Sequence, residues 1–124
     1  MKTALVIEDN EDNMRLITFI LEKNGYSTIT AENGKMGIEL ALKERPDFIL
    51  LDIQLPDMNG QEVLKEIRKS EIDDEIPIIA VTSYAMSGDR ERLLQAGCNG
   101  YIEKPIDTFS IMNQIRKVIG SSHG

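Results

Sequence analysis

Residues 46–60 decide the fold of this chain, and they read PDFILLDIQLPDMNG. Pro46 closes the preceding helical segment, because the residue before a proline is pushed out of helical geometry. The run from Phe48 to Leu51 is apolar without alternation, which is typical of a parallel strand covered by helices on both faces. Asp52 follows at once, and Asp57 to Gly60 supply turn chemistry. The stretch therefore predicts a central strand that ends in an aspartate.

Short apolar runs alternate along the whole chain with segments of helical spacing. The predicted strands are residues 4–7, 27–31, 48–51, 78–81 and 100–102. The predicted helices cover residues 12–24, 34–44, a segment around 63–67, residues 88–96 and a segment around 111–119. Such alternation predicts consecutive βαβ units, and so an α/β fold with a doubly wound, mainly parallel five-stranded sheet.

The predicted helices carry apolar residues on one face and glycine at their ends. The first helix is expected to bury Met14, Ile17 and Leu21, which recur at helical spacing. It is expected to stop at Asn24-Gly25, and Gly120 is expected to end the last helix, because glycine favours the position after a helix. Residues 1–120 are thus expected to form one domain, followed by a disordered tail at 121–124.

Composition limits the classes of function. The chain has 124 residues, which suits one domain, and its net charge is -7 without a cluster of Lys and Arg, so we do not expect direct nucleic-acid binding. Cys98 is the only cysteine, which excludes an intrachain disulfide. Met1-Lys2 leads directly into a strand, and no apolar run approaches the roughly 20 residues that cross a bilayer. We therefore expect a cytoplasmic protein that does not insert into membranes.

Polar side chains suited to phosphate or metal chemistry follow four of the predicted strands. They are Glu8-Asp9, Asp52, Thr82 and Lys104. Taken singly, each has an ordinary structural interpretation: a helix-capping turn, a turn residue, a strand-end hydroxyl and a solvated lysine. Ligands of an open parallel sheet bind outside the carboxyl ends of its strands, so we expect these side chains to meet in one pocket.

Carboxylates that converge without a counterion repel one another, which predicts a divalent cation among them. Oxygen-only ligands with positions left to water suit Mg²⁺, which commonly sits beside phosphates. A carboxylate attacks a phosphate poorly because both are anionic, and a bridging metal removes that obstacle. The pocket is therefore a candidate phosphoryl-acceptor site.

The order Glu8-Asp9, Asp52, Thr82, Lys104-Pro105 resembles the receiver domains of bacterial two-component response regulators over essentially the whole chain. This resemblance implies a flavodoxin-like (βα)5 fold with strand order 2-1-3-4-5. It also implies a phosphoacceptor signalling protein whose partners are a sensor histidine kinase and either a histidine phosphotransferase or a downstream protein target. Such a protein is not an enzyme in the usual sense, since it catalyses only its own phosphorylation and dephosphorylation.

The resemblance also assigns roles residue by residue. Asp52 would be the phosphoacceptor, and Asp9, Asp52 and the backbone carbonyl of Gln54 would ligate Mg²⁺, with Glu8 bound through water. The remaining roles fall on three strand-end positions and one aromatic residue. Thr82 and Lys104 would contact phosphoryl oxygens. Tyr101 would turn inward together with Thr82, as a switch that changes the surface of the fourth helix, fifth strand and fifth helix. The Lys104-Pro105 bond would be cis.

Three positions mark how this chain differs within the family. Ser83 stands where receivers usually have Ala or Gly, so it joins the expected phosphate-binding residues. Gln54 and Tyr84 occupy variable positions that tune hydrolysis of the phosphoryl group. The segment from Tyr84 to Asp89, with Gly97-Cys98 after it, is similar to polar cell-fate regulators of the DivK type and to receivers attached to hybrid histidine kinases.

Three rival functions are each opposed by one feature of the sequence. A haloacid-dehalogenase-like phosphatase or phosphotransferase needs a second aspartate two residues after its nucleophile, and Gln54 stands there. A flavodoxin-like FMN carrier needs a phosphate-cradling loop after the first strand, and residues 8–12 are acidic instead. A receiver-shaped protein that signals by binding alone would not need the complete acidic set.

Overall fold

The fold was analysed in a computed structural model, which describes residues 2–70, 76–83 and 87–121. Strands and helices alternate throughout these residues. The elements are β1 (Thr3–Ile7), α1 (Glu11–Lys23), β2 (Ser27–Ala31), α2 (Gly34–Glu44), β3 (Phe48–Asp52), α3 (Gly60–Ser70), β4 (Ile78–Thr82), α4 (Ser87–Ala96), β5 (Gly100–Glu103) and α5 (Ile111–Ser121).

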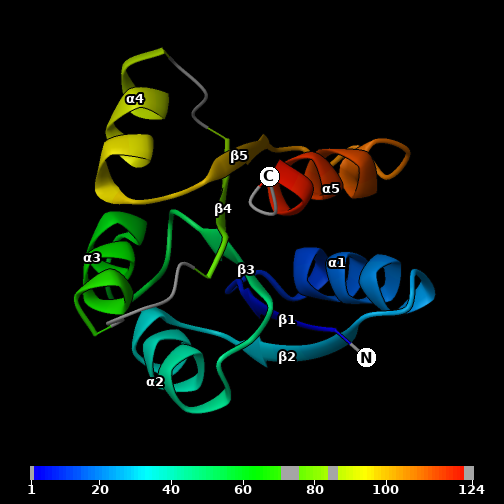
Figure 1. The fold of residues 1–124 in the computed structure, drawn as a ribbon, viewed down its shortest axis with the longest axis horizontal. Coiled ribbons are helices and arrows are strands. Elements are labelled where there is room, and N and C mark those ends of the chain that lie inside the picture. Colours follow the sequence, from blue (N-terminus) through cyan, green and yellow to red (C-terminus); the bar gives the residue numbers. More distant parts are fainter. Residues whose placement is uncertain (1, 71–75, 84–86, 122–124) are drawn as a thin grey trace.

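The strands form one parallel sheet in the order β2-β1-β3-β4-β5. This confirms the doubly wound α/β fold and the strand order that the resemblance implied. Figure 1 shows α2, α3 and α4 on one side of the sheet and α1 and α5 on the other. Strand order reverses beside β1, because β2 lies on one side of it and β3 on the other.

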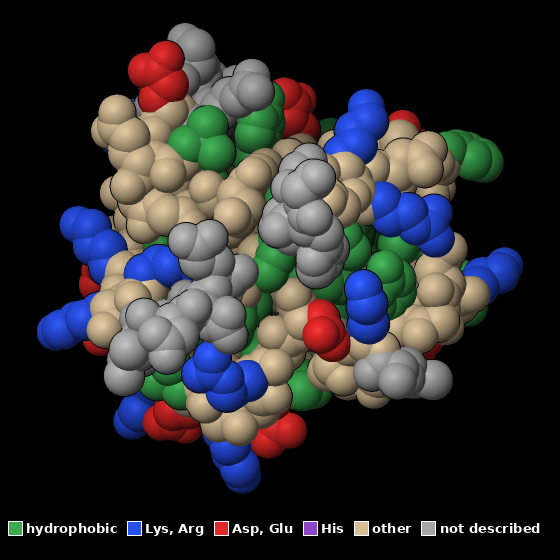
Figure 2. All heavy atoms as spheres, viewed as in Figure 1, with side chains coloured by type: hydrophobic (Ala, Val, Ile, Leu, Met, Phe, Trp, Pro, Cys, Tyr) green, Lys and Arg blue, Asp and Glu red, His purple; other side chains and the backbone are tan. Residues whose placement is uncertain are grey.

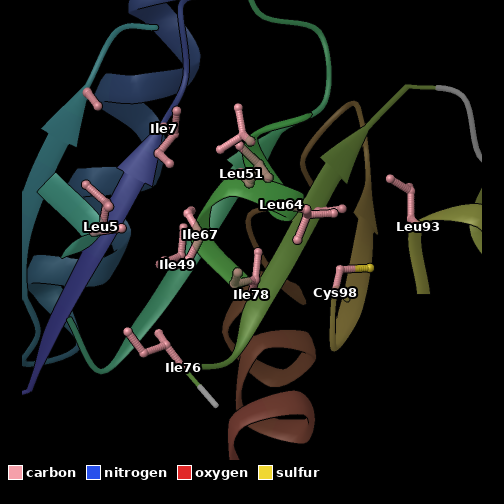
Figure 3. Close-up of a cluster of buried hydrophobic side chains, with 14 residues drawn as sticks. Leu5, Ile7, Ile49, Leu51, Leu64, Ile67, Ile76, Ile78, Leu93 and Cys98 are labelled. Carbon is pink, nitrogen blue, oxygen red and sulfur yellow. The ribbon is translucent and has the colours of Figure 1, made fainter. Parts of the chain in front are cut away.

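Side chains of the sheet alternate between two buried clusters, one under each layer of helices. Leu5 and Ile7 of β1 enter the cluster on the side of α2 and α3, whereas Ala4 and Val6 enter the cluster on the side of α1 and α5. Figure 3 shows the first cluster, with Leu64 and Ile67 of α3 lying against the sheet. All five residues of β3 are buried, as expected of a strand covered on both faces.

The structure corrects some predicted boundaries and one buried face. β1 ends at Ile7 as expected, whereas β3, β4 and β5 each extend one residue further, so that Asp52 and Thr82 close β3 and β4. Met14 is only half-buried, whereas Ile17 and Leu21 are fully buried. Gly120 does not end the last helix but lies within it, because α5 continues to Ser121.

The surface bears charges of both signs. In the view of Figure 2, Lys and Arg side chains lie interspersed with Asp and Glu around the rim and do not gather into one basic patch on this face. Within residues 2–70, 76–83 and 87–121, no helix is long and apolar enough to span a membrane.

Candidate functional site

The pairing of β1 with β3 places two acidic side chains next to each other at the carboxyl edge of the sheet. Ile7 pairs with Leu51, so the residues that follow, Glu8 and Asp52, emerge side by side. Both are buried, with 2% and 3% of their surface exposed, whereas Asp9 is exposed. Carboxylate oxygens of Glu8, Asp9 and Asp52 all lie within 4.8 Å of one another.

The alternative that Glu8-Asp9-Asn10 merely caps a helix applies to Asn10 alone. Asn10 is the N-cap of α1, and its Oδ1 accepts the N–H of Asn13 at 2.9 Å. The N–H of Asn10 in turn donates to Oε2 of Glu8 at 3.1 Å. Capping therefore leaves the other oxygen of Glu8 and the carboxylate of Asp9 available to the site.

Lys104 brings a positive charge to the same place from the end of β5. Its Nζ lies 3.2 Å from Oε1 of Glu8 and 3.3 Å from Oδ2 of Asp52. The backbone N–H of Lys104 donates to the carbonyl of Thr82 at 2.8 Å, and the Lys104-Pro105 peptide bond is cis. The lysine thus contacts the two buried carboxylates that the β1 and β3 ends contribute.

The electrostatics of the site are unbalanced without a further cation. The pKa of Glu8 is raised to about 7, first by burial and then by contact with Asp52, while the N–H of Asn10 and the charge of Lys104 act in the opposite direction. Oε1 of Glu8 is fully buried and accepts no hydrogen bond within the described part of the chain, although the Lys104 ammonium is near. One ammonium does not neutralise three carboxylates, so the donor set fits a hard divalent cation.

Gln54 lies beside Asp52 in a closed loop between β3 and α3. Its N–H donates to Oδ1 of Asp52 at 3.0 Å, and it forms an isolated antiparallel bridge with Asn59. The N–H of Gly60 donates to the carbonyl of Ile53 at 2.9 Å, which closes the loop at its base. The loop therefore fixes the backbone of Gln54 next to the aspartate.

The structure places the remaining expected residues on β4 and β5. Thr82 is buried at the end of β4, the strand whose Val81 pairs with Asp52, and Ser83 is exposed directly after it. Tyr101 is half-buried on the edge strand β5, where it lines a pocket together with Glu103 and Pro105. Tyr84 lies outside the described residues.

The chain matches the family model of the response regulator receiver domain over residues 4–116. It belongs to the response regulator receiver family. The match covers most of the sheet and all the polar residues that gather at its carboxyl edge. Receiver domains are signalling proteins rather than enzymes in the usual sense, and as a class they interact with histidine kinases and downstream targets.

Similar proteins agree with this assignment. The polar-differentiation response regulator DivK of Brucella anthropi is 44% identical over 121 residues, which is 98% of each chain. The receiver domain of sensor histidine kinase PA1611 from Pseudomonas aeruginosa is 36% identical and superimposes with a TM-score of 0.86. The match covers 96% of this chain and 98% of that domain, whose structure has a magnesium ion coordinated in the active-site cleft. Chemotaxis protein CheY4 of Vibrio cholerae, at 24% identity, shares the fold with a TM-score of 0.89 and covers 95% of this receiver and 98% of its own chain.

One residue of this region was assigned only to a turn by sequence reasoning. Oδ1 of Asp57 accepts the N–H of Gly34 at 2.8 Å, and Oδ2 accepts the N–H of Lys35 at 3.0 Å. These contacts join the loop after β3 to the first turn of α2, 22 and 23 residues earlier in the chain. No local sequence signal indicates the contact, because aspartate before Asn-Gly is typical of a turn whatever it touches.

Proposed function

We propose that this receiver is a phosphoacceptor of a two-component system or phosphorelay, in which Asp52 accepts the phosphoryl group from the phosphohistidine of a sensor histidine kinase. One observation supports this most strongly. Three carboxylates converge within 4.8 Å, and the Lys104 ammonium lies within 3.3 Å of the two that are buried. An arrangement that combines a nucleophilic carboxylate, a cation site and a fixed ammonium suits phosphoryl transfer, which requires mainly positioning and charge stabilisation.

Asp9, Asp52 and the carbonyl of Gln54 would hold Mg²⁺, and Glu8 would contact it through water. The fit rests on Oε1 of Glu8, which is buried and accepts no hydrogen bond from the described residues, and on the oxygen-only donor set. When bound, the ion neutralises charge between the carboxylate and the incoming phosphoryl group.

The transfer itself needs no separate general base, because a carboxylate is already ionised near neutral pH. An oxygen of Asp52 forms a bond to phosphorus while the bond from phosphorus to the histidine nitrogen breaks, and that nitrogen keeps the electron pair. Lys104 would stabilise the charge on the phosphoryl oxygens. The hydroxyls of Thr82 and Ser83 would donate hydrogen bonds to the same oxygens.

The phosphoryl group would act as a signal by moving Thr82. Drawn toward new acceptor oxygens, this buried hydroxyl would vacate space that Tyr101 enters, which changes the surface of α4, β5 and α5. Moving an equilibrium from about 1:99 to 99:1 takes roughly 5.5 kcal/mol, so several charge-assisted contacts must favour the same state. Amide hydrogen exchange with and without a phosphoryl mimic should differ most over α4, β5 and α5, and unchanged protection there would contradict the switch.

The proposal extends to organisation and location. Residues 1–120 act as one receiver domain, whose own catalysis is confined to gaining and losing its phosphoryl group. Output then depends on a protein partner, either a downstream target or a histidine phosphotransferase. Kinases draw phosphoryl groups from ATP, a cytoplasmic metabolite, which favours a cytoplasmic location.

Intact mass spectrometry tests the phosphoacceptor directly. We expect one labile phosphoryl adduct when the protein is incubated with Mg²⁺ and a small phosphodonor such as acetyl phosphate, and we expect Asp52→Asn to abolish it. Asp47→Asn is the matched control, because Asp47 precedes the other end of the same strand and its carboxylate accepts the N–H of Thr3, away from the site. An adduct that persists in Asp52→Asn would exclude Asp52 as the acceptor, and turnover of many donor equivalents without an adduct would favour a phosphatase.

A further inference from the structure

Asp57 forms a polar bridge between two segments that are far apart in the sequence. Its two carboxylate oxygens accept the N–H groups of Gly34 and Lys35, which open α2. The first N–H groups of a helix lack partners inside the helix and carry partial positive charge, so an anion there is favourable. These two hydrogen bonds lower the pKa of Asp57, which keeps the carboxylate ionised.

An apolar contact joins the same two segments. A Cβ added to Gly34 would collide with the side chain of Met58, which shows that Met58 lies directly over this glycine. The loop after β3 therefore rests on α2 through two consecutive residues, one polar and one apolar. A side chain at position 34 would fit only if the Met58 side chain moved away.

The anchored loop is the one that holds the metal-site backbone. Its base is closed by Gly60 and Ile53, and Gln54 forms a bridge to Asn59 inside it. The N–H of Gln54 donates to Oδ1 of Asp52. A displacement of the loop away from α2 would therefore act on both the carbonyl of Gln54 and the carboxylate of Asp52.

Stabilising α2 does not by itself explain the position of Asp57. Asn33 already caps this helix, since its Oδ1 accepts the N–H of Met36 at 2.8 Å. The bridge from Asp57 is a second contact at the same helix end, and it comes from the loop that adjoins the site. It thus constrains the loop as much as it stabilises the helix.

We propose that Asp57 is a positioning residue for the metal site: by fixing residues 53–60 to the first turn of α2, it holds Gln54 and, through the Gln54 N–H, the Asp52 carboxylate. The inference rests on the proposed phosphoacceptor function and deepens it. Residues that orient metal ligands without touching the metal contribute substantially to affinity.

Calorimetric titration of the metal-free protein with Mg²⁺ tests the inference. We expect Asp57→Ala to raise the Mg²⁺ Kd roughly tenfold, as is typical for loss of a residue that supports a ligand. Asp57→Asn keeps one acceptor oxygen and should lie between Asp57→Ala and the wild type. Asn33→Ala is the matched control, because it weakens the same helix end without touching the loop and should leave the Kd unchanged.

A second readout needs no metal. In metal-free protein, the amide of Gln54 should exchange its hydrogen faster in Asp57→Asn than in wild type or Asn33→Ala, because the loop opens more often. This measurement decides the matter if Asp57→Ala does not fold. The inference would be overturned if the Asp57 variants kept the wild-type Kd and exchange rate, or if Asn33→Ala changed both as much as they do. The proposed phosphoacceptor function would survive either result. Absence of Mg²⁺ binding by wild type would instead overturn the proposed function as well.

Discussion

Replacing Glu8 by glutamine should stabilise the metal-free protein above pH 7 while weakening its response to Mg²⁺. The buried carboxylate has a pKa raised from 4.5 to about 7, chiefly by burial. An unfolded chain loses the Glu8 proton near pH 4.5, whereas the folded chain keeps it until about pH 7. The folded state therefore binds more protons in this window, and the free energy of unfolding falls as pH rises through it.

The size of the effect follows from the same two values. The difference between 4.5 and about 7, at about 1.4 kcal/mol per pH unit, sets an upper limit of roughly 3 kcal/mol at pH 8. Glutamine is neutral at every pH, so this cost disappears in the variant. Near pH 4.5 the difference between variant and wild type should be close to zero, and it should grow until about pH 7.

Urea unfolding of metal-free protein from pH 4.5 to 8, followed by circular dichroism, measures this difference. Glu11→Gln is the control, because that side chain is 87% exposed and lies only a few residues away. A Glu8→Gln variant whose stability follows the same pH dependence as wild type would refute the reasoning. Millimolar Mg²⁺ should then reduce or reverse the difference in free energy of unfolding between Glu8→Gln and wild type at pH 8. A ligand that binds the folded state stabilises it more when its affinity is higher, and wild type is expected to bind Mg²⁺ more tightly.

Two further predictions concern the core. Gly37→Ala should lower the free energy of unfolding by about 1–3 kcal/mol, because the added Cβ would come within 2.5 Å of Cδ1 of Ile7. Gly120→Ala should instead raise the free energy of unfolding by about 0.5 kcal/mol, because its added Cβ meets nothing within 4 Å. Equal urea midpoints for the two variants would contradict this account. Cys98 is 6% exposed and burial raises its pKa, so a thiol reagent at pH 8 should label native protein roughly a hundredfold more slowly than urea-unfolded protein; similar rates would show that the thiol is accessible.

Local patterns in the sequence were sufficient for the elements and for their approximate ends. Helical spacing identified the buried Ile17 and Leu21, and the unbroken apolar run at Phe48 to Leu51 identified the strand buried on both faces. The errors lie at element boundaries and at Met14, which is only half-buried. Gly120 was expected to end α5, but a glycine in the last turn of a helix costs only about 1 kcal/mol, which packing of the preceding residues offsets.

The acidic set could be predicted because each member directly follows an apolar strand. The rule that carboxyl ends of parallel strands share one edge then predicts that Glu8, Asp9 and Asp52 lie together, as they do in the structure. The strand order could not be predicted in this way, because it came from the resemblance to receiver domains and not from the spacing of residues. Nothing local distinguishes an edge strand such as β2 from its neighbours in a reliable way.

The sequence by itself determined the alternation of strands and helices, the buried central strand and the polar residues that must appear at its carboxyl edge, because these depend on the chemistry of neighbouring residues. Only the tertiary structure decided that Lys104 contacts Glu8 and Asp52, that Asn10 takes the capping role, and that Asp57 reaches α2. Some of these contacts join residues that are far apart in the chain, and others decide which of several adjacent residues takes a given role. They depend on how strands pack and how loops close, and no spacing of residue types records that.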